Sequence, residues 1–318
     1  MKKFFKVLGI FLLIIIIACV ATAVVFVKTK LNKINYENVT ANDIEINEGV
    51  EEVLTGYTNI ALLGLDAQDA TFTNSRSDCI MIISINNDTK EVKIASVYRD
   101  TYLNIDEHGL DKVTHAYAFG KAPLALSTIN KNLDLDITEY VTIDFNSVIN
   151  IVDAIGGVEI TVTSAEASQI PGISSTGTYN LTGTQALAYG RIRKIDTDYA
   201  RTERMRNVVI KVFEKAKKLS LTQLNSLIDE LLPEVTTNIS QTEILSYASK
   251  IGEYNVTDSF GWPYKVRGYT GAAWYAAPVT LEENVRKLHE QLFENEEYEV
   301  SETVKEISQN IINKTGYR

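Results

Sequence analysis

The sequence predicts a mixed α/β domain, in which helices flank a central β-sheet, behind a single N-terminal transmembrane helix. Three observations lead to this prediction. After residue 57, short apolar runs typical of buried strands interleave with amphipathic helical patterns. One apolar block fills residues 7–27. The chain has 2 cysteines, Cys19 inside that block and Cys79 far beyond it, so the domain depends on a hydrophobic core and not on disulfides.

The apolar block is long enough to cross a bilayer. Its 21 residues span ~30 Å at a rise of ~1.5 Å per residue. Lysines flank it on both sides, but the short basic start and the large acidic remainder favour a signal anchor with the C-terminal domain outside the cell. The alternatives are a cleaved signal peptide, suggested by the small residues Ala21 and Ala23, and a lipoprotein processing site at Cys19.

The chain divides into five segments. Residues 1–6 form the cytoplasmic tail and residues 7–27 the anchor. Residues 28–56 are polar and acidic, and we expect a stalk with some helix. We expect the core domain at 57–220 and a helical C-terminal extension, packed on that core, at 221–318.

Period-two apolar patterns and turn residues place the strands. The expected strands are residues 58–65, 79–86, 93–97, 140–144 and 158–162. The turn at 87–90 joins two of them and predicts a hairpin.

Helical patterns lie between and after these strands. The expected helices are residues 122–133, 145–155, 184–191, 204–219, 221–232, 242–251, 281–293 and 301–312. The pair Gly156–Gly157 ends the second of them. Residues 263–278 are rich in aromatic side chains and glycine, and we expect a loop region there. Its rings could stack on sugars, but packing against the core is the simpler expectation.

A dense cationic strip stands out on this acidic chain. The net charge is −10, yet residues 191–206 hold five arginines and two aspartates. Guanidinium groups match phosphate and carboxylate oxygens, so the strip predicts an anionic ligand. In an extended segment, Arg191 and Arg193 would point the same way. The arginines expected to bind the anion are Arg191, Arg193 and Arg201.

The alternative for this strip is a solvated helix face with Asp198 and Glu203 as neutralising partners. Asp196 and Asp198 could instead orient Arg201 or Arg204. We expect Arg204 and Arg206 to begin a helix whose charges face solvent.

Candidate acids lie at strand ends, where α/β sheets bind ligands. Asp66 ends the first strand and Asp78 immediately precedes the second. Two carboxylates there suit an octahedral Mg²⁺ ion that keeps waters for phosphate. The alternative is that Asp66 caps a turn and Asp78 pairs with Arg76. The dipeptide Arg99–Asp100 adds a cation at a strand end of the same sheet, although such pairs are mostly surface ion pairs.

A small polar cluster between apolar segments holds Lys112, Thr114, His115 and Tyr117. A lone histidine is more often structural than catalytic, and this is the simpler expectation for His115. The 3 histidines are too few and too scattered for a histidine-based zinc site.

Seven segments carry a resemblance to a known family. They are NIALLGLD (59–66), SRSDCIMIISI (75–85), SVYRDTY (96–102), DKVTHAYAFG (111–120), DAIGGVEI (153–160), LTGTQALAYGRIRKIDTDYARTERMRNVV (181–209) and LEENVRKLHEQLF (281–293). With these motifs in this order behind one membrane helix, the chain resembles the LytR-CpsA-Psr phosphotransferases of Gram-positive cell envelopes.

The resemblance implies a function and a location. Such proteins transfer an anionic glycopolymer, wall teichoic acid or capsular polysaccharide, from an undecaprenyl-pyrophosphate carrier to peptidoglycan and leave a phosphodiester link. The implied cofactor is Mg²⁺ or Mn²⁺, and the polyprenyl tail is implied to lie in an apolar tunnel between sheet and helices. The protein is expected in the cell membrane, with a single span and its domain outside.

The resemblance also implies residue roles. Asp66 and Asp78 correspond to the metal-binding and acid–base pair, while Arg76 and Arg99 contact the pyrophosphate. The rest of the pyrophosphate clamp is Arg191, Arg193 and Arg201. The implied supporting residues are Asp100, Asp196, Asp198, Lys112 and His115.

Three positions depart from the family pattern. Tyr98 stands where many relatives have proline, and Thr197 replaces a common glycine. These two are expected to alter backbone stiffness only. Met205 replaces a common glutamine and removes a polar group near the clamp.

Two other function classes are open to comparison. A non-catalytic module would bind lipid-linked polymer tightly without Mg²⁺-dependent turnover. Transcription attenuation would need a DNA-binding domain in the cytoplasm. The 6 residues before the anchor leave no room for one, so we expect no nucleic-acid partner.

Overall fold

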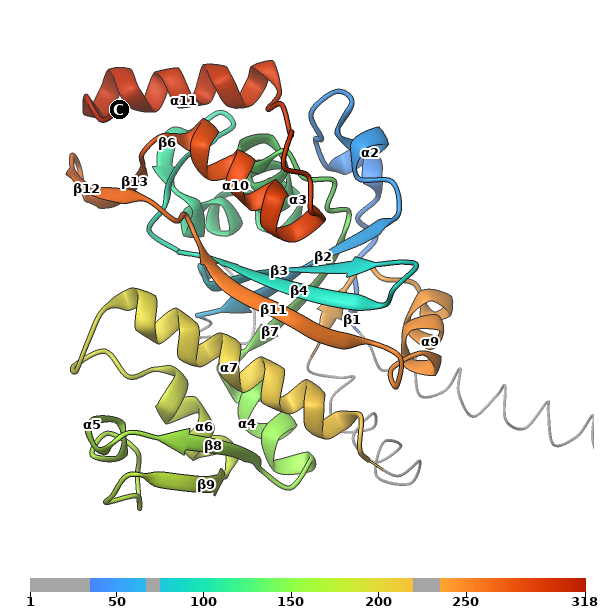
Figure 1. Ribbon diagram of the computed structural model, residues 1–318, viewed down its shortest axis with the longest axis vertical. Helices are drawn as coiled ribbons and strands as arrows, with labels where there is room; N and C mark the ends of the chain where they lie inside the picture. The colour runs from blue at the N-terminus through green and yellow to red at the C-terminus, as the bar shows by residue number, and fades with distance from the viewer. Residues whose placement is uncertain (1–34, 67–74, 220–234) are drawn as a thin grey trace, which may run out of the picture.

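The computed structural model describes residues 35–66, 75–219 and 235–318 (Figure 1). The transmembrane helix predicted at 7–27 and the helix predicted at 221–232 lie outside these ranges. Among the helices of the described ranges, none has the length and apolar character needed to cross a membrane.

A seven-stranded mixed sheet lies at the centre of the domain. Its strands are β1 (Asn35–Tyr36), β2 (Tyr57–Leu65), β3 (Ser77–Asn86), β4 (Glu91–Val97), β7 (Glu139–Asp144), β10 (Thr236–Thr237) and β11 (Asn255–Trp262). Across the sheet they follow the order β1, β10, β7, β2, β3, β4, β11. Strand β3 pairs antiparallel with β2 and β4, whereas β7 runs parallel to β2 and β11 parallel to β4. The mixed sheet and the predicted hairpin are therefore confirmed.

One layer of helices lies above the sheet in Figure 1. It contains α3 (Val113–Leu133), α10 (Leu281–Phe293) and α11 (Glu302–Thr315). Helix α3 begins well before the expected residue 122, because two helical stretches continue across a kink. At this kink Gly120 and Lys121 have φ angles of −142° and 57°. The kink breaks the helical periodicity, so the sequence pattern revealed only the second stretch.

A second layer lies below the sheet (Figure 1). It contains α4 (Phe145–Ala154), β8 (Val158–Val162), α5 (Ser164–Ala167), β9 (Gly177–Leu181), α6 (Gly183–Gly190) and α7 (Asp198–Ala216). Helix α7 begins before the expected residue 204. The Thr197 hydroxyl accepts a hydrogen bond from the Ala200 amide and caps the first turn. This cap places Arg201 and Arg204 inside the helix.

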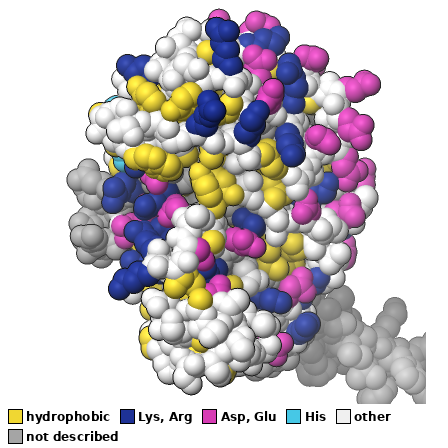
Figure 2. Space-filling view, turned by 60° about the vertical axis from the view of Figure 1, so that its left-hand side comes forward, with side chains coloured by type: hydrophobic (Ala, Val, Ile, Leu, Met, Phe, Trp, Pro, Cys, Tyr) yellow, Lys and Arg dark blue, Asp and Glu magenta, His cyan; other side chains and the backbone are white. Residues whose placement is uncertain are grey.

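Cationic side chains gather between the two layers. Figure 2 brings forward the side of the molecule that carries the beginning of α7, and it shows Lys and Arg side chains clustered there beside acidic and hydrophobic ones. The ends of β2 and β4 and the beginning of β3 lie at this same edge of the sheet.

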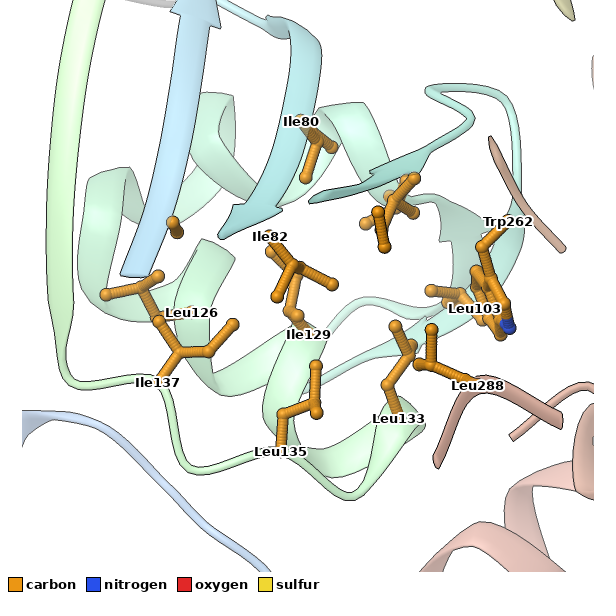
Figure 3. Packing of buried hydrophobic residues seen from close by; sticks show 14 of the residues in the cluster. Ile80, Ile82, Leu103, Leu126, Ile129, Leu133, Leu135, Ile137, Trp262 and Leu288 are labelled. Carbon is orange, nitrogen blue, oxygen red and sulfur yellow. The ribbon is translucent and has the colours of Figure 1, made fainter. Parts of the chain in front are cut away.

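The main core fills the space between the sheet and the upper helices (Figure 3). Ile80 and Ile82 of β3 pack with Leu126 and Ile129 of α3, and Trp262 ends β11 in the same cluster. Each of these side chains is at most 2% exposed. Burying one such side chain contributes about 1.5–3 kcal/mol, so this layer fixes the position of β3 and of the residues at its start.

Part of the predicted stalk belongs to the domain. Strand β1 joins the sheet, and η1 (Ala41–Asp43) and α2 (Val50–Val53) follow it. Ile44, Val50 and Leu54 are buried in the main core. These scattered apolar side chains give no periodic signal in a polar segment, which is why the pattern suggested a stalk.

The prediction of a purely helical C-terminal extension is wrong. Strands β10 and β11 join the sheet, beside the expected helix α9 (Gln241–Ser249). Residues 263–278 are not a loop but contain the hairpin β12 (Val266–Thr270) and β13 (Trp274–Pro278). Another hairpin, β5 (Tyr102–Ile105) and β6 (Gly109–Lys112), lies in a segment where the sequence pattern predicted no strand. Strand β11 escaped prediction because it is an edge strand whose polar residues, such as Asp258, interrupt the apolar run.

Candidate functional site

Asp78 and Arg99 meet at the edge of the sheet because of the register between β3 and β4. Ile80 pairs with Val97, so residues two positions beyond each come opposite one another. The Arg99 Nη1 donates to Asp78 Oδ2 at 2.8 Å. The Asp78 side chain is 5% exposed and that of Arg99 21% exposed. This is a charge-assisted hydrogen bond in a mostly buried setting, where such bonds are strong.

Two arginines of the cationic strip join this pair. The Arg193 Nη2 lies 3.9 Å from Asp78 Oδ2, and its side chain is 52% exposed. Arg201, in the first turns of α7, lies 2.9 Å from Asp198 Oδ1 and is 3% exposed. Asp198 is also 3.7 Å from the Arg99 Nε. We call Asp78, Arg99, Arg193, Asp198 and Arg201 the arginine cluster.

The arginine cluster has unused capacity to bind an anion. The Nε atoms of Arg99 and Arg201 are buried without a hydrogen-bond partner in the described structure. Burial, together with Arg99 and Arg193, holds the pKa of Arg201 below its usual value despite Asp198. Burial also acts to lower the pKa of Arg99, but Asp78, Asp100 and Asp198 outweigh it and raise that pKa. An incoming phosphate would relieve the repulsion between these guanidinium groups.

The beginning of α3 supports the cluster from the side of the upper layer. The Lys112 Nζ lies 2.7 Å from Asp100 Oδ1, and the Thr114 hydroxyl donates to the Ser77 carbonyl at 3.0 Å. Asp100 in turn lies 3.7 Å from the Arg99 Nε, so Lys112 and Asp100 are connected to the arginine cluster. His115 instead pairs with Asp111 at 2.8 Å, away from the arginine cluster.

Asp66 lies on the strand next to Asp78. Its amide donates to the Arg76 carbonyl at 3.0 Å, at the point where β2 and β3 come together. Its carboxylate pairs with no side chain among the described residues, and the Arg76 side chain is exposed. The alternative prediction, in which Asp78 pairs with Arg76, is wrong, because Asp78 pairs with Arg99.

The structure separates the remaining arginines of the strip. Arg191 ends α6 with φ −102° and ψ 4°, so the expected extended alternation with Arg193 is wrong. Its guanidinium lies 4.4 Å from the centre of the Phe145 ring. Phe145 is distant from Arg191 along the chain, so the local sequence pattern could not reveal this stacking contact.

Arg204 and Arg206 do not face solvent, contrary to expectation. They are 5% and 7% exposed. Arg204 lies 2.7 Å from Glu166 and also pairs closely with Asp196, while Arg206 donates to the Ser96 hydroxyl at 3.1 Å. Glu166 neutralises Arg204 from α5. Its Thr163-x-x-Glu166 spacing signals a helix cap, but not this ion pair.

An apolar groove lies between the sheet and α7, and Cys79, which follows Asp78 of the arginine cluster, is part of its lining. Its first part is lined by Leu62, Gly64, Cys79, Met81, Ile143, Phe145, Val148, Ala186, Leu187, Gly190, Arg191, Met205, Val208 and Val209. A second part, of about 340 Å³, shares Val209 and continues toward α9. Burial raises the pKa of the Cys79 thiol to about 12, so the thiol stays neutral. We call this the sheet–α7 groove.

The departures from the family pattern have structural roles. The Tyr98 amide donates to the Trp262 carbonyl at 2.9 Å, a bond that proline could not make. Its ring also packs on Tyr199, with centroids 4.4 Å apart. Thr197 caps α7, and Met205 lines the sheet–α7 groove. The effects of Tyr98 and Thr197 therefore go beyond backbone stiffness.

Fold and site together define a class: an α/β protein with a cluster of arginines beside an apolar groove. This arrangement suits a phosphate group that is carried on a lipid tail.

The chain belongs to the LytR_cpsA_psr family, whose model matches residues 21–291. It is 31% identical over 224 residues to the polyisoprenyl-teichoic acid–peptidoglycan teichoic acid transferase TagT of Bacillus subtilis, covering 66% of this chain and 70% of that protein. It is 30% identical over 262 residues to TagU of Oceanobacillus iheyensis, covering 78% of each. The solved structure of TagT bound to LIIa-WTA is similar with a TM-score of 0.65 at 26% identity, over 81% of this chain and 96% of that one.

Proposed function

We propose that this protein is a phosphotransferase of the cell envelope, anchored in the membrane by residues 7–27 with its domain outside. It moves an anionic glycopolymer, wall teichoic acid or capsular polysaccharide, from an undecaprenyl-pyrophosphate carrier to peptidoglycan. The observation that carries the proposal is the position of the arginine cluster beside the sheet–α7 groove, whose lining includes Cys79, the neighbour of Asp78. Membership of the family, and the names of TagT and TagU, support the same activity.

The two parts of the site fit the two parts of the donor. The pyrophosphate is proposed to bind Arg99, Arg193 and Arg201, whose donors match phosphate oxygens. Arg76 is exposed beside Asp78 and can add a contact. The polyprenyl tail is proposed to lie in the sheet–α7 groove, where apolar side chains replace water around it.

A divalent cation, Mg²⁺ or Mn²⁺, is a further proposal. The described residues contain no group of three or more candidate metal ligands. Asp66 and Asp78 nevertheless offer the one or two carboxylates with which Mg²⁺ is usually held beside phosphates. When bound, such an ion would neutralise charge on the phosphoryl oxygens.

Asp66 and Asp78 are proposed to have different roles in the reaction. Asp78 is held by Arg99 and Arg193, so it orients these two arginines. The Asp66 carboxylate has no such partner among the described residues, and we assign to it the proton of the attacking sugar hydroxyl. The guanidinium groups stabilise the lipid phosphate as it leaves.

The test uses the detergent-solubilised full chain with lipid-linked polymer and a peptidoglycan acceptor. Arg99→Ala and Asp78→Ala should remain folded and lose transfer by about 10²- to 10³-fold, the typical effect of removing one group that stabilises developing charge. Arg286→Ala is the matched control, because this arginine lies on α10 with a 43% exposed side chain and pairs only with surface carboxylates in the described structure. Normal transfer by either cluster variant would refute the assignment.

A further inference from the structure

The hairpin β12–β13 displays an exposed tryptophan. Trp274 is 49% exposed, whereas Trp262, at the end of β11, is 0% exposed. Tyr275, the next residue after Trp274, is buried against Tyr102 with ring centroids 4.5 Å apart. The aromatic segment is therefore divided between rings that pack in the core and one indole that faces outward.

The indole of Trp274 packs against Gly268. It lies across the hairpin from Gly268, at the diagonal position of the antiparallel pairing. A Cβ atom on Gly268 would come within 2.9 Å of the indole Nε1 and 3.4 Å of Cε2. The ring thus rests against the glycine backbone, and a larger residue there would displace it. The exposed part of the ring faces away from Gly268.

The hairpin that carries this ring is joined to the segment that directly follows Arg99. The Ala276 amide donates to the Asp100 carbonyl at 2.8 Å, and Ala276 forms a bridge with Thr101. Asp100 follows Arg99 directly. Trp274 is two residues from Ala276 on the same face of the strand, a separation of about 7 Å.

The two sides of the arginine cluster therefore differ. The sheet–α7 groove is lined by side chains of α7, which lies below the sheet in Figure 1, whereas the β12–β13 hairpin lies above the sheet. In phosphoryl transfer the attacking and leaving oxygens lie roughly in line on opposite sides of the phosphorus. If the lipid phosphate leaves toward the groove, the attacking hydroxyl comes from the side of the hairpin.

We propose that Trp274 is a stacking platform for a sugar ring of the glycan acceptor. This inference rests on the proposed function for the identity of the acceptor. The aliphatic C–H face of a pyranose matches the flat, rigid and half-exposed indole, which orders at low entropic cost. A neutral sugar requires no charged partner at this position.

Intrinsic fluorescence gives a direct binding test, because the chain has 2 tryptophans and Trp262 is buried. The probe is chitotetraose, a soluble β-1,4-linked N-acetylglucosamine oligomer. We expect a saturable change in emission and protection from acrylamide quenching in the full chain. Trp274→Phe should abolish this response. An absent response, or the same response in Trp274→Phe, overturns the proposal.

Transfer kinetics give the second test. Trp274→Ala should raise the KM for the glycan acceptor about five- to tenfold, the scale of one aromatic stacking contact. The KM for the lipid-linked donor and the turnover at saturating acceptor should stay unchanged. Gly268→Val should act in the same direction by displacing the indole. Tyr36→Ala is the matched control, since Tyr36 is a 54% exposed aromatic residue on the far edge strand of the sheet.

The outcomes separate this proposal from the proposed function. Chitotetraose binding at Trp274 without any polymer transfer supports the platform and refutes the transferase. Transfer with an unchanged acceptor KM in Trp274→Ala refutes the platform alone. An emission shift with phosphatidylcholine vesicles and none with chitotetraose would identify a membrane contact and overturn the proposal.

Discussion

The three arginines of the arginine cluster share two carboxylates, those of Asp78 and Asp198. Their charges are balanced in different ways. Arg201 is buried and depends on Asp198, whereas Arg193 is half-exposed and only 3.9 Å from Asp78. A buried guanidinium with a paired carboxylate is fixed in position, because freeing it would leave an uncompensated charge. Arg193 has the freedom to move onto an incoming anion. Arg201 therefore has a fixed position in the site, whereas Arg193 can adjust its position when the anion binds.

His289 shows how burial controls a titrating residue outside the site. It is 0% exposed on α10, stacks on Tyr298 at 3.6 Å, and donates from Nε2 to the Leu133 carbonyl at 3.0 Å. Burial lowers its pKa from 6.5 to about 4. The folded protein thus holds this histidine neutral over a range in which the unfolded chain protonates it.

The consequence is a loss of stability in mild acid. A depressed pKa in the folded state gives a contribution that is complete above pH 6.5 and is lost as the pH falls toward 4. Between pH 7 and pH 5, we expect the free energy of unfolding to fall by about 2 kcal/mol through His289. Urea unfolding should show this fall in the wild type and a much smaller one in His289→Gln.

His108→Gln is the control for this measurement, since His108 is exposed. It should leave the pH dependence unchanged. Equal pH dependence in the wild type and in His289→Gln would contradict the burial argument.

At the residue scale, sequence could indicate the site but not its pairings. Asp78 and Arg99 were predictable because strand ends meet at a sheet edge. The burial of Arg204 was not, because its partner Glu166 lies 38 positions earlier and reaches it only through the packing of α5 against α7. Nothing in the local pattern distinguishes such an arginine from a solvated one.

At the scale of elements, helix α7 has two functional faces. One carries Met205, Val208 and Val209 toward the sheet and lines the groove. A neighbouring face carries Ile210 and polar residues, and lines a recess of about 410 Å³ outside the groove. The two faces follow from the helical period, with which residues one position apart point about 100° apart.

Narrowing the groove should block the lipid and leave the fold intact. Val209 lines both parts of the groove, so Val209→Trp places an indole in the path of the polyprenyl tail. Titration calorimetry with octaprenyl pyrophosphate in detergent should show affinity reduced by about tenfold or more. Lys211→Trp, at an exposed position of the same helix that lines neither part of the groove, should bind like the wild type. Equal affinities for both variants would place the lipid elsewhere.

The elements themselves were predictable where the local pattern and the tertiary structure agree. Strands β3 and β4 are buried in the centre of the sheet, and their apolar runs joined by a polar turn revealed the hairpin. Strand β11 packs at the edge with Asp258 and Ser259 among its residues, so its place depends on pairing with β4. The helical stretch before Gly120 was hidden in the same way by the kink that follows it.

At the scale of the whole molecule, the two faces of the sheet have different proposed roles. Its lower face and α7 enclose the groove proposed for the lipid, and its upper face carries the main core and the hairpin with Trp274. The arginine cluster lies at the edge of the sheet where β3 begins and β4 ends. This arrangement lets donor and acceptor approach one phosphorus atom from different sides.

The central claim is that the arginine cluster performs transfer and does not merely bind the donor. A single-turnover reaction tests it most directly, with the full chain in excess over lipid-linked polymer and with peptidoglycan glycan and Mg²⁺ present. Mass spectrometry should find polyprenyl monophosphate and phosphodiester-linked glycan forming in equal amounts and at the same rate. Donor that remains bound but intact would contradict the account and identify the protein as a binding module for lipid-linked polymer.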